Sequence, residues 1–184
     1  MNAEALFALL KEARKLCGHS EYVVVGSLSV LGLADVTAIP ADMTMSIDAD
    51  CYTLNDPSRV LDLQAALGEG SGFHIANGIY LDPINPRLPT LPDQWEGRLI
   101  EVHRDQVVAH FLEPHDAAVS KLARGEQRDI RWVSAGAKAN IISLPTVAVR
   151  MRNTQFLDEV EKKAAHAVLD RIKDNLSHGR QGSG

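Results

Sequence analysis

Two aspartates two positions apart, Asp48 and Asp50, are the residues whose types and spacing best suit chemistry in this chain. They belong to segment 44–52, which is typical of a β-strand. Side chains at positions i and i+2 of a strand point to the same face, so both carboxylates would lie side by side. Mg²⁺ is a hard cation that binds one or two carboxylates together with phosphate oxygens. The pair therefore predicts a magnesium site beside a bound phosphate.

The Gly26-Ser27 pair is a second feature that suits a phosphate group. It follows the apolar strand expected over residues 22–25 and precedes a short apolar helix expected over 27–34. A turn from a strand into a helix directs free backbone N–H groups at an anion. Together with Asp48 and Asp50, this turn predicts a site for a nucleoside triphosphate and its metal.

The residues around Asp48 and Asp50 bear on whether this pair is a metal site. Burying two like charges side by side is costly unless a cation compensates them, and strongly apolar residues flank this pair. An exposed sheet face would remove that cost, because solvent-facing aspartates are common on edge strands. From the residues alone, a metal site and a solvated acidic pair both stay open.

Hydrophobic periodicity and helix breakers predict the helices that must position these residues. The first helix is expected to end at Gly18, and Gly68 and Gly70 are expected to end the helix at 57–67. The expected helices cover residues 2–17, 57–67, 115–124, 127–137 and 154–176. The last of these carries an apolar stripe of Leu157, Val160, Ala164, Val168, Ile172 and Leu176.

Further strands are expected in the middle of the chain. Asn77-Gly78 is typical of a tight hairpin between short strands at 73–76 and 79–81. A second hairpin is expected from residues 98–103 and 106–112, after a proline-rich loop at 82–93 that could lie over a site. The order of elements predicts an α+β fold, a mixed β-sheet flanked by helices. Its core would span residues 1–112, with a helical C-terminal region, 113–184, packed on that core.

Composition and charge narrow the classes of protein. The chain has 184 residues, of which 45% are hydrophobic, enough for one globular domain. Its net charge of −5 argues against a protein that coats nucleic acid over its whole surface. Segment 120–152, however, holds seven basic and two acidic residues, a local balance of +5. Such a segment is typical of a phosphate- or RNA-facing surface, or of a solvated helix face.

Several kinds of site and location are not expected. The sequence shows neither a secretory leader nor an apolar run near the ~20 residues that span a bilayer. Cys17 and Cys51 form no disulfide framework, so a reducing, cytoplasmic setting without membrane contact is expected. The seven histidines lack the spacing of zinc ligands, although His103 and His110 could meet across the second hairpin. The two tryptophans are expected to pack rather than to stack on bases.

Two sets of residues resemble a known family. Gly26-Ser27 and Asp48-Ala49-Asp50 resemble the signature of the minimal nucleotidyltransferases of the DNA polymerase beta superfamily. Residues 112–130 (LEPHDAAVSKLARGEQRDI) and the loop 91–99 (LPDQWEGRL) resemble the bacterial branch related to abortive-infection toxins of type IV toxin–antitoxin systems. The resemblance covers residues 22–131, and the motif blocks together are far more specific than either alone.

The resemblance implies transfer of a nucleotidyl group from an NTP to a hydroxyl on RNA such as tRNA, on a protein or on a small molecule. It also implies a toxin component with an antitoxin protein as partner. Gly26 and Ser27 would hold the β- and γ-phosphates, and Lys121 would neutralise triphosphate charge. Asp48 and Asp50 would coordinate one or two Mg²⁺ or Mn²⁺ ions.

The chain departs from the family pattern in two places. Ser27 and Asp48 lie 21 positions apart, roughly twice the spacing of the compact signature, and the extra residues fall in segment 34–42. Active members also carry a third carboxylate, on a later strand, that helps to deprotonate the acceptor hydroxyl. Asp82 is the candidate for that acid, although Pro83 leaves a turn role open, and Glu101 is a weaker substitute.

A missing third acid would change the expected function. The chain would then be a nucleotidyltransferase-fold binding or regulatory module that binds NTP with little or no turnover. Asp129 is expected either to orient Lys121 or Arg128 through a helical salt bridge or to form an ordinary surface ion pair.

Overall fold

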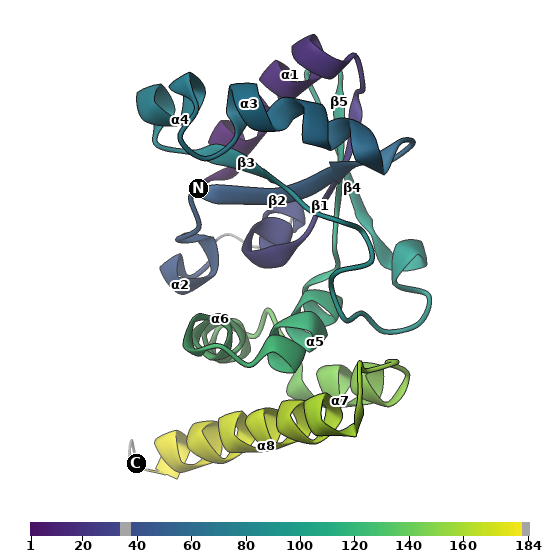
Figure 1. The fold of residues 1–184 in the computed structure, drawn as a ribbon. Coiled ribbons are helices and arrows are strands. Elements are labelled where there is room, and N and C mark those ends of the chain that lie inside the picture. Colours follow the sequence, from purple (N-terminus) through teal and green to yellow (C-terminus); the bar gives the residue numbers. More distant parts are fainter. Residues whose placement is uncertain (34–37, 182–184) are drawn as a thin grey trace.

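The computed structural model describes residues 1–33 and 38–181 and contains a five-stranded mixed β-sheet. Helices cover both faces of this sheet, and four long helices close the C-terminal half (Figure 1). The α+β class expected from the sequence is therefore confirmed. The strands are β1 (Glu21–Val24), β2 (Asp48–Thr53), β3 (Tyr80–Pro83), β4 (Ile100–Arg104) and β5 (Val107–Phe111).

The order of strands in the sheet is β3-β2-β1-β5-β4. The central strand β1 runs antiparallel to β2 and parallel to β5, and Tyr22, Val23 and Val24 are fully buried in it. The edge strand β3 runs parallel to β2, with Asp50 opposite Asp82. This register decides which side chains of the two strands share a face.

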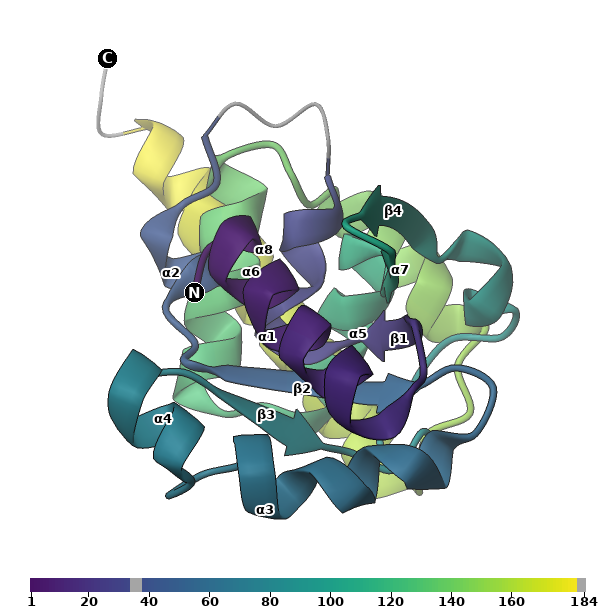
Figure 2. The ribbon, with the colours of Figure 1, turned by 90° about the horizontal axis from the view of Figure 1, so that it is seen from above.

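The helices form two layers around the sheet. Figures 1 and 2 show α1, α3 and α4 on one side and α5 to α8 on the other. The N-terminal half contains α1 (Ala3–Cys17), η1 (Gly26–Gly32), α2 (Ala41–Thr44), η2 (Pro57–Leu63), α3 (Gln64–Leu67), α4 (Gly72–Asn77) and η3 (Trp95–Arg98). The C-terminal half contains α5 (Pro114–Arg124), α6 (Gln127–Lys138), α7 (Leu144–Arg152) and α8 (Glu159–Gln181).

The first expected hairpin, at 73–81, is wrong. Its first half is the helix α4, because the Ser71 hydroxyl accepts the His74 N–H and caps the helix. Gly78, at φ +68°, ends that helix and donates its N–H to the His74 carbonyl. Asn-Gly fits a hairpin turn and a helix C-terminus equally well, because both need a positive φ. Its second half is β3, which pairs with β2 instead of with residues 73–76.

Two further boundaries differ from the expectation. The strand expected at 44–52 begins only at Asp48, because α2 ends at Thr44. The helix expected at 154–176 begins at Glu159, and α7 was not expected. Leu157, Val160 and Ala164 are exposed, the first two to 86% and 75%, so the first three positions of the expected stripe are wrong. The buried positions of α8 are Ala165, Leu169 and Ile172.

The other elements agree with the sequence. The first helix ends at Gly18, the second hairpin is β4–β5, and α5 and α6 lie where they were expected. The helix expected at 57–67 consists of η2 followed by α3. The helix expected at 27–34 is η1, and residues 34–37 lie outside the described residues.

The C-terminal helices are tied to the sheet through Trp132. Its indole N–H donates to the carbonyl oxygens of Ser27 and Met43, both at 3.1 Å. These bonds fix α6 against η1, which follows β1, and against α2. The division of the chain into a core of 1–112 and a C-terminal region of 113–184 stays a prediction. Among the described residues, no helix combines the length and the apolar character needed to cross a membrane.

Candidate active site

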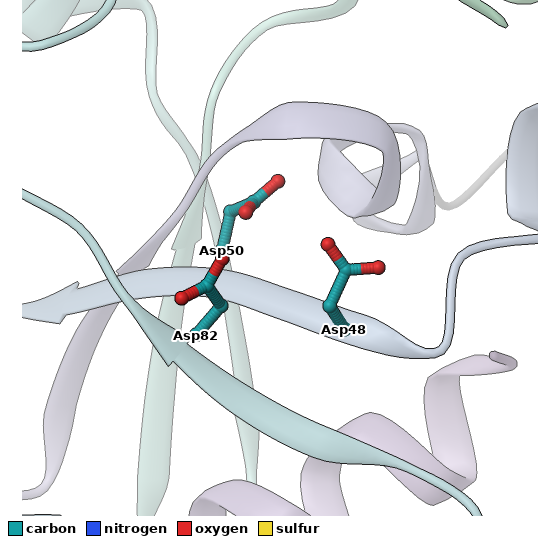
Figure 3. Close-up of side chains that lie close together, drawn as sticks. All are labelled: Asp48, Asp50 and Asp82. Atoms are coloured by element: carbon teal, nitrogen blue, oxygen red, sulfur yellow. The ribbon is translucent and has the colours of Figure 1, made fainter. Parts of the chain in front are cut away.

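Three carboxylates converge on one face of the sheet. Asp48 and Asp50 on β2 and Asp82 on β3 each offer an oxygen, and these oxygens lie within 4.8 Å of one another (Figure 3). Strand alternation gives Asp48 and Asp50 a common face, and Ala49 between them is fully buried on the other face. Asp82 joins them because it lies opposite Asp50 in the parallel register. Glu101, the substitute candidate, lies on β4 at the opposite edge of the sheet.

The charges of the three carboxylates fit a divalent cation. Burial and the neighbouring carboxylates of Asp48 and Asp82 raise the pKa of Asp50 to about 6. Burial, Asp48 and Glu69 raise the pKa of Asp82 as well. Ser46 donates its hydroxyl hydrogen to Asp48, but no side-chain donor of the described residues contacts Asp50 or Asp82. Carboxylate oxygens without donors suit a hard cation such as Mg²⁺ or Mn²⁺.

The stability of the metal-free protein should therefore depend on Asp50. Its folded-state pKa of about 6 lies above the ordinary aspartate pKa of 3.8, so this group stabilises the fold fully below about pH 4 and loses that contribution as the pH rises through about 6. In EDTA, Asp50→Asn is expected to raise the free energy of unfolding by about 1–2 kcal/mol at pH 7.5, and by less at pH 5. Urea denaturation of both proteins at the two pH values measures this. A difference that does not change with pH would contradict the assignment.

Gly26 allows the Gly-Ser turn to lie against the acidic cluster. It has a φ of +65°, and a Cβ at this position would lie 2.0 Å from Oδ2 of Asp50. The turn is also tied to β2, since the Val25 N–H donates to the Asp50 carbonyl at 2.9 Å. Ser29 closes the turn by donating its hydroxyl hydrogen to the Gly26 carbonyl, also at 2.9 Å. The close approach of Gly26 therefore helps to determine where the Asp50 carboxylate lies.

Gly26→Ala is expected to destabilise the protein by about 2 kcal/mol or more and to weaken stabilisation by Mg²⁺. About half of that cost is the positive φ of a residue with a Cβ, and the rest is displacement of the Asp50 carboxylate. Gly78→Ala is the matched control, because Gly78 has a φ of +68° and open space around its Cβ position. Thermal unfolding with and without Mg²⁺ measures both effects. Equal losses of stability and of Mg²⁺ stabilisation in the two variants would show that the contact of Gly26 with Asp50 affects neither quantity.

Lys121 reaches the Gly-Ser turn from α5. Its Nζ donates to Oγ of Ser27 at 3.0 Å and to Oδ1 of Asp129 at 3.3 Å. It also lies 4.9 Å from the centroid of the Trp132 ring, and its side chain is only 4% exposed. Burial lowers the pKa of Lys121, and Asp129 opposes that shift. The structure thus brings Lys121 beside Ser27.

Asp129 holds two cations, one of which was not expected. It contacts Lys121 and also Arg124, whose Nε and Nη2 donate to its two oxygens at 2.7 and 2.6 Å. Although burial opposes ionisation of Asp129, the bonds from Arg124 and Lys121 hold its pKa below the usual value. Of the two cations expected as alternatives beside Asp129, Lys121 is the one it contacts, whereas Arg128 pairs with Glu126 at 2.7 Å. An ordinary surface ion pair is also excluded, because Asp129 is 1% exposed.

Arg124 is the site residue that the sequence interpretation missed. It is about half exposed and lines the cavity of the site, whereas Lys121 is almost completely buried. A signal was available, because Lys121 and Arg124 are three positions apart and lie on the same side of a helix. Arg124 therefore presents the more accessible cation to a ligand.

A cavity of about 590 Å³ lies between the sheet and the C-terminal helices. Its lining includes the three aspartates, the Gly-Ser turn, Lys121 and Arg124, together with Leu88, Thr90 and Glu161. The Thr90 hydroxyl donates to Glu161 at 3.2 Å, which ties the proline-rich loop to α8. This size is typical of small-molecule sites.

The remaining candidates lie elsewhere. His110 lies opposite Glu101 across the β4–β5 hairpin and His103 lies opposite Val108, so the two histidines do not face each other. Trp132 is buried and Trp95 packs against the core, as expected.

One comparison with known proteins identifies the family. Residues 4–175 match the model of a family described as "Nucleotidyltransferase of unknown function (DUF6036)". No curated protein and no solved structure matches the chain. The matched residues include the three aspartates, the Gly-Ser turn and the three cationic residues that line the cavity, Lys121, Arg124 and Arg128. The chain therefore belongs to this family of nucleotidyltransferases.

Proposed function

We propose that the protein is a Mg²⁺-dependent nucleotidyltransferase that moves a nucleotidyl group from an NTP to a hydroxyl acceptor. The observation that carries this proposal is the convergence of Asp48, Asp50 and Asp82 within 4.8 Å, beside a Gly-Ser turn and a buried lysine. Membership of the family supports the class of reaction.

The three aspartates would have two roles at the reacting atoms, metal binding and proton transfer. Asp48 and Asp50 would hold Mg²⁺, with Mn²⁺ as an alternative, and Asp82 would complete the acidic cluster. When bound, the metal stabilises negative charge on the attacking and leaving oxygens. The acceptor oxygen bonds to the α-phosphorus, the bond from that phosphorus to the β-phosphate oxygen breaks, and pyrophosphate leaves. Asp82 would accept the proton of the acceptor hydroxyl.

The triphosphate would lie against the Gly-Ser turn. Gly26 and Ser27 would donate backbone N–H groups and a hydroxyl to the β- and γ-phosphates. Lys121, 3.0 Å from the Ser27 hydroxyl, would contribute positive charge. Arg124 would add a planar guanidinium, which suits phosphate oxygens and is held in orientation by Asp129.

RNA such as tRNA is the acceptor that we favour over a protein. The basic segment 120–152 supports this choice, and the side chain of Arg128, which lines the cavity, is 64% exposed. The resemblance of residues 112–130 to type IV toxins adds a toxin role in the cytoplasm, with an antitoxin protein as partner, to the proposal.

The position of Asp82 bears on the alternative function. An isolated Asp48–Asp50 pair would favour a module that binds NTP without turnover. Asp82 lies opposite Asp50 in the sheet instead, and this arrangement supports the enzyme.

Incubation with each α-labelled NTP, Mg²⁺ and total RNA tests the proposal. We expect label to appear in RNA with at least one NTP and to disappear when EDTA replaces Mg²⁺. NTP binding without transfer to RNA or protein would establish the binding module instead. If the protein neither transfers label nor binds any NTP, the proposed function is wrong.

A further inference from the structure

Tyr80 is an aromatic side chain of the cavity that the proposed reaction does not use. It is the first residue of β3, lies opposite Asp48 in the sheet and precedes Asp82 by two positions. Side chains two apart on a strand share a face, so the Tyr80 ring lies on the face of the three carboxylates. It also lines the cavity. The ring is therefore next to the place where the reacting atoms would meet.

The Tyr80 ring is supported from behind. The centroid of the His74 ring lies 4.8 Å from the Tyr80 centroid, with an angle of 55° between the planes. His74 does not line the cavity, so the Tyr80 ring lies between α4 and the cavity. The His74 ring is held in turn, because its Nδ1 accepts the Gly70 N–H at 2.9 Å. The backbone of Tyr80 is fixed through its N–H, which donates to the Ile47 carbonyl at 3.1 Å.

The packing of the core does not account for this ring. The neighbouring Leu81 is fully buried and supplies the core contact of β3, whereas Tyr80 is only partly buried. The Tyr80 hydroxyl has no hydrogen-bond partner within residues 1–33 and 38–181. A supported, partly exposed aromatic ring beside a charged centre suits a planar ligand that carries charge on one side.

We propose that Tyr80, supported by His74, is a stacking platform for a nucleobase. The inference rests on the proposed function, because both substrates of a nucleotidyl transfer to RNA place a base one ribose away from the reacting atoms. Every base has a π-face, so the platform would accept different bases, and its contribution to affinity would be about 5- to 150-fold. The base belongs either to the incoming NTP or to the end of the RNA acceptor, and binding measurements separate these sources.

The test compares Tyr80→Leu with Tyr80→Phe and Tyr80→Trp, which keep an aromatic ring. Phe73→Leu is the matched control, because Phe73 is a partly buried aromatic residue of α4 that does not line the cavity. Three probes are titrated in Mg²⁺: an ATP analogue with a methylene bridge between the α- and β-phosphates, a short oligoadenylate, and inorganic triphosphate. Thermal unfolding of each variant verifies that it is folded.

Tyr80→Leu is expected to weaken binding of the ATP analogue or of the oligoadenylate by about tenfold. The aromatic variants should bind like the wild type, and inorganic triphosphate, which has no base, should bind all variants equally. Loss of affinity for the analogue assigns the platform to the NTP, and loss for the oligoadenylate assigns it to the acceptor.

Two results would overturn the inference. One is unchanged affinity of Tyr80→Leu for both base-containing probes, and the other is an equal loss of affinity for inorganic triphosphate. In either case, label transfer by the wild type would leave the proposed function intact. A wild type that binds no probe and transfers no label would overturn the proposed function as well.

Discussion

Replacing Asp50 with asparagine is expected to reduce the rate of nucleotidyl transfer by at least about a thousandfold, while the protein stays folded. Asparagine has nearly the same shape, so the packing of Gly26 against this side chain is retained. The change removes one of the three negative charges that would hold the metal. A metal contributes several kcal/mol of transition-state stabilisation, and each 1.36 kcal/mol corresponds to tenfold in rate. Measurement of kcat/KM with labelled NTP gives the loss directly.

Two further measurements make this prediction specific. Mg²⁺ should raise the temperature of unfolding of the wild type but have little effect on that of Asp50→Asn. Glu101→Gln is the matched control, because this carboxylate lies at the opposite edge of the sheet and is about half exposed. It should leave the rate unchanged. If Asp50→Asn kept more than about a tenth of the wild-type rate, Asp50 would not be a metal ligand of the reaction.

Asp129→Ala is expected to lower the free energy of unfolding by about 3–5 kcal/mol. Removal of one partner from a buried ion pair costs this much, because the other charge is left buried without compensation. Here the uncompensated charge is Lys121, whose side chain is 4% exposed. Arg124 adds little to the loss, because it is about half exposed and can turn to solvent. Urea denaturation at pH 7.5 measures the difference from the wild type.

Two variants control for causes other than the buried charge. Asp170→Ala removes an exposed partner of Lys173 on α8 and should cost less than about 1 kcal/mol. The double variant Lys121→Met with Asp129→Ala should recover part of the loss, because no buried cation then remains unpaired. Equal losses in the free energy of unfolding for Asp129→Ala and Asp170→Ala would mean that another group or water stabilises the Lys121 charge.

The parts of the site that the sequence predicted depend on local geometry. Asp48 and Asp50 share a face because side chains alternate along any strand. Gly26-Ser27 follows an apolar strand directly, so the place of the turn could also be recognised locally. Lys121 and Asp129 lie eight positions apart on consecutive helices, and the structure brings them to 3.3 Å. None of these features required knowledge of which strands pair.

The parts that the sequence did not predict depend on tertiary contacts. Asp82 was identified as an acid, but its position beside Asp50 depends on the parallel pairing of β3 with β2, which the expected hairpin at 73–81 did not include. Asn77-Gly78 satisfies two local structures, and the cap at Ser71 selects the helix. Arg124 was missed although its spacing to Lys121 places both on one side of α5, because that spacing alone does not tell that the Arg124 side chain borders a cavity. Leu157 was placed in the stripe although α8 begins two residues later.

The edge position of β3 has a consequence for control of activity. Within the part of the chain that the structure describes, β2 is the one neighbour of this strand in the sheet, and β3 ends at Pro83, which has no N–H to donate. A slip of β3 by one residue would turn Asp82 away from the cavity but leave Asp48, Asp50 and the Gly-Ser turn in place. Under the proposed function, retention of a nucleotide would therefore need only β2 and the Gly-Ser turn, whereas its chemical conversion would also need β3 in the observed register. In the slipped register, the chain would under the proposed function bind a nucleotide without converting it, although no side chain is lost.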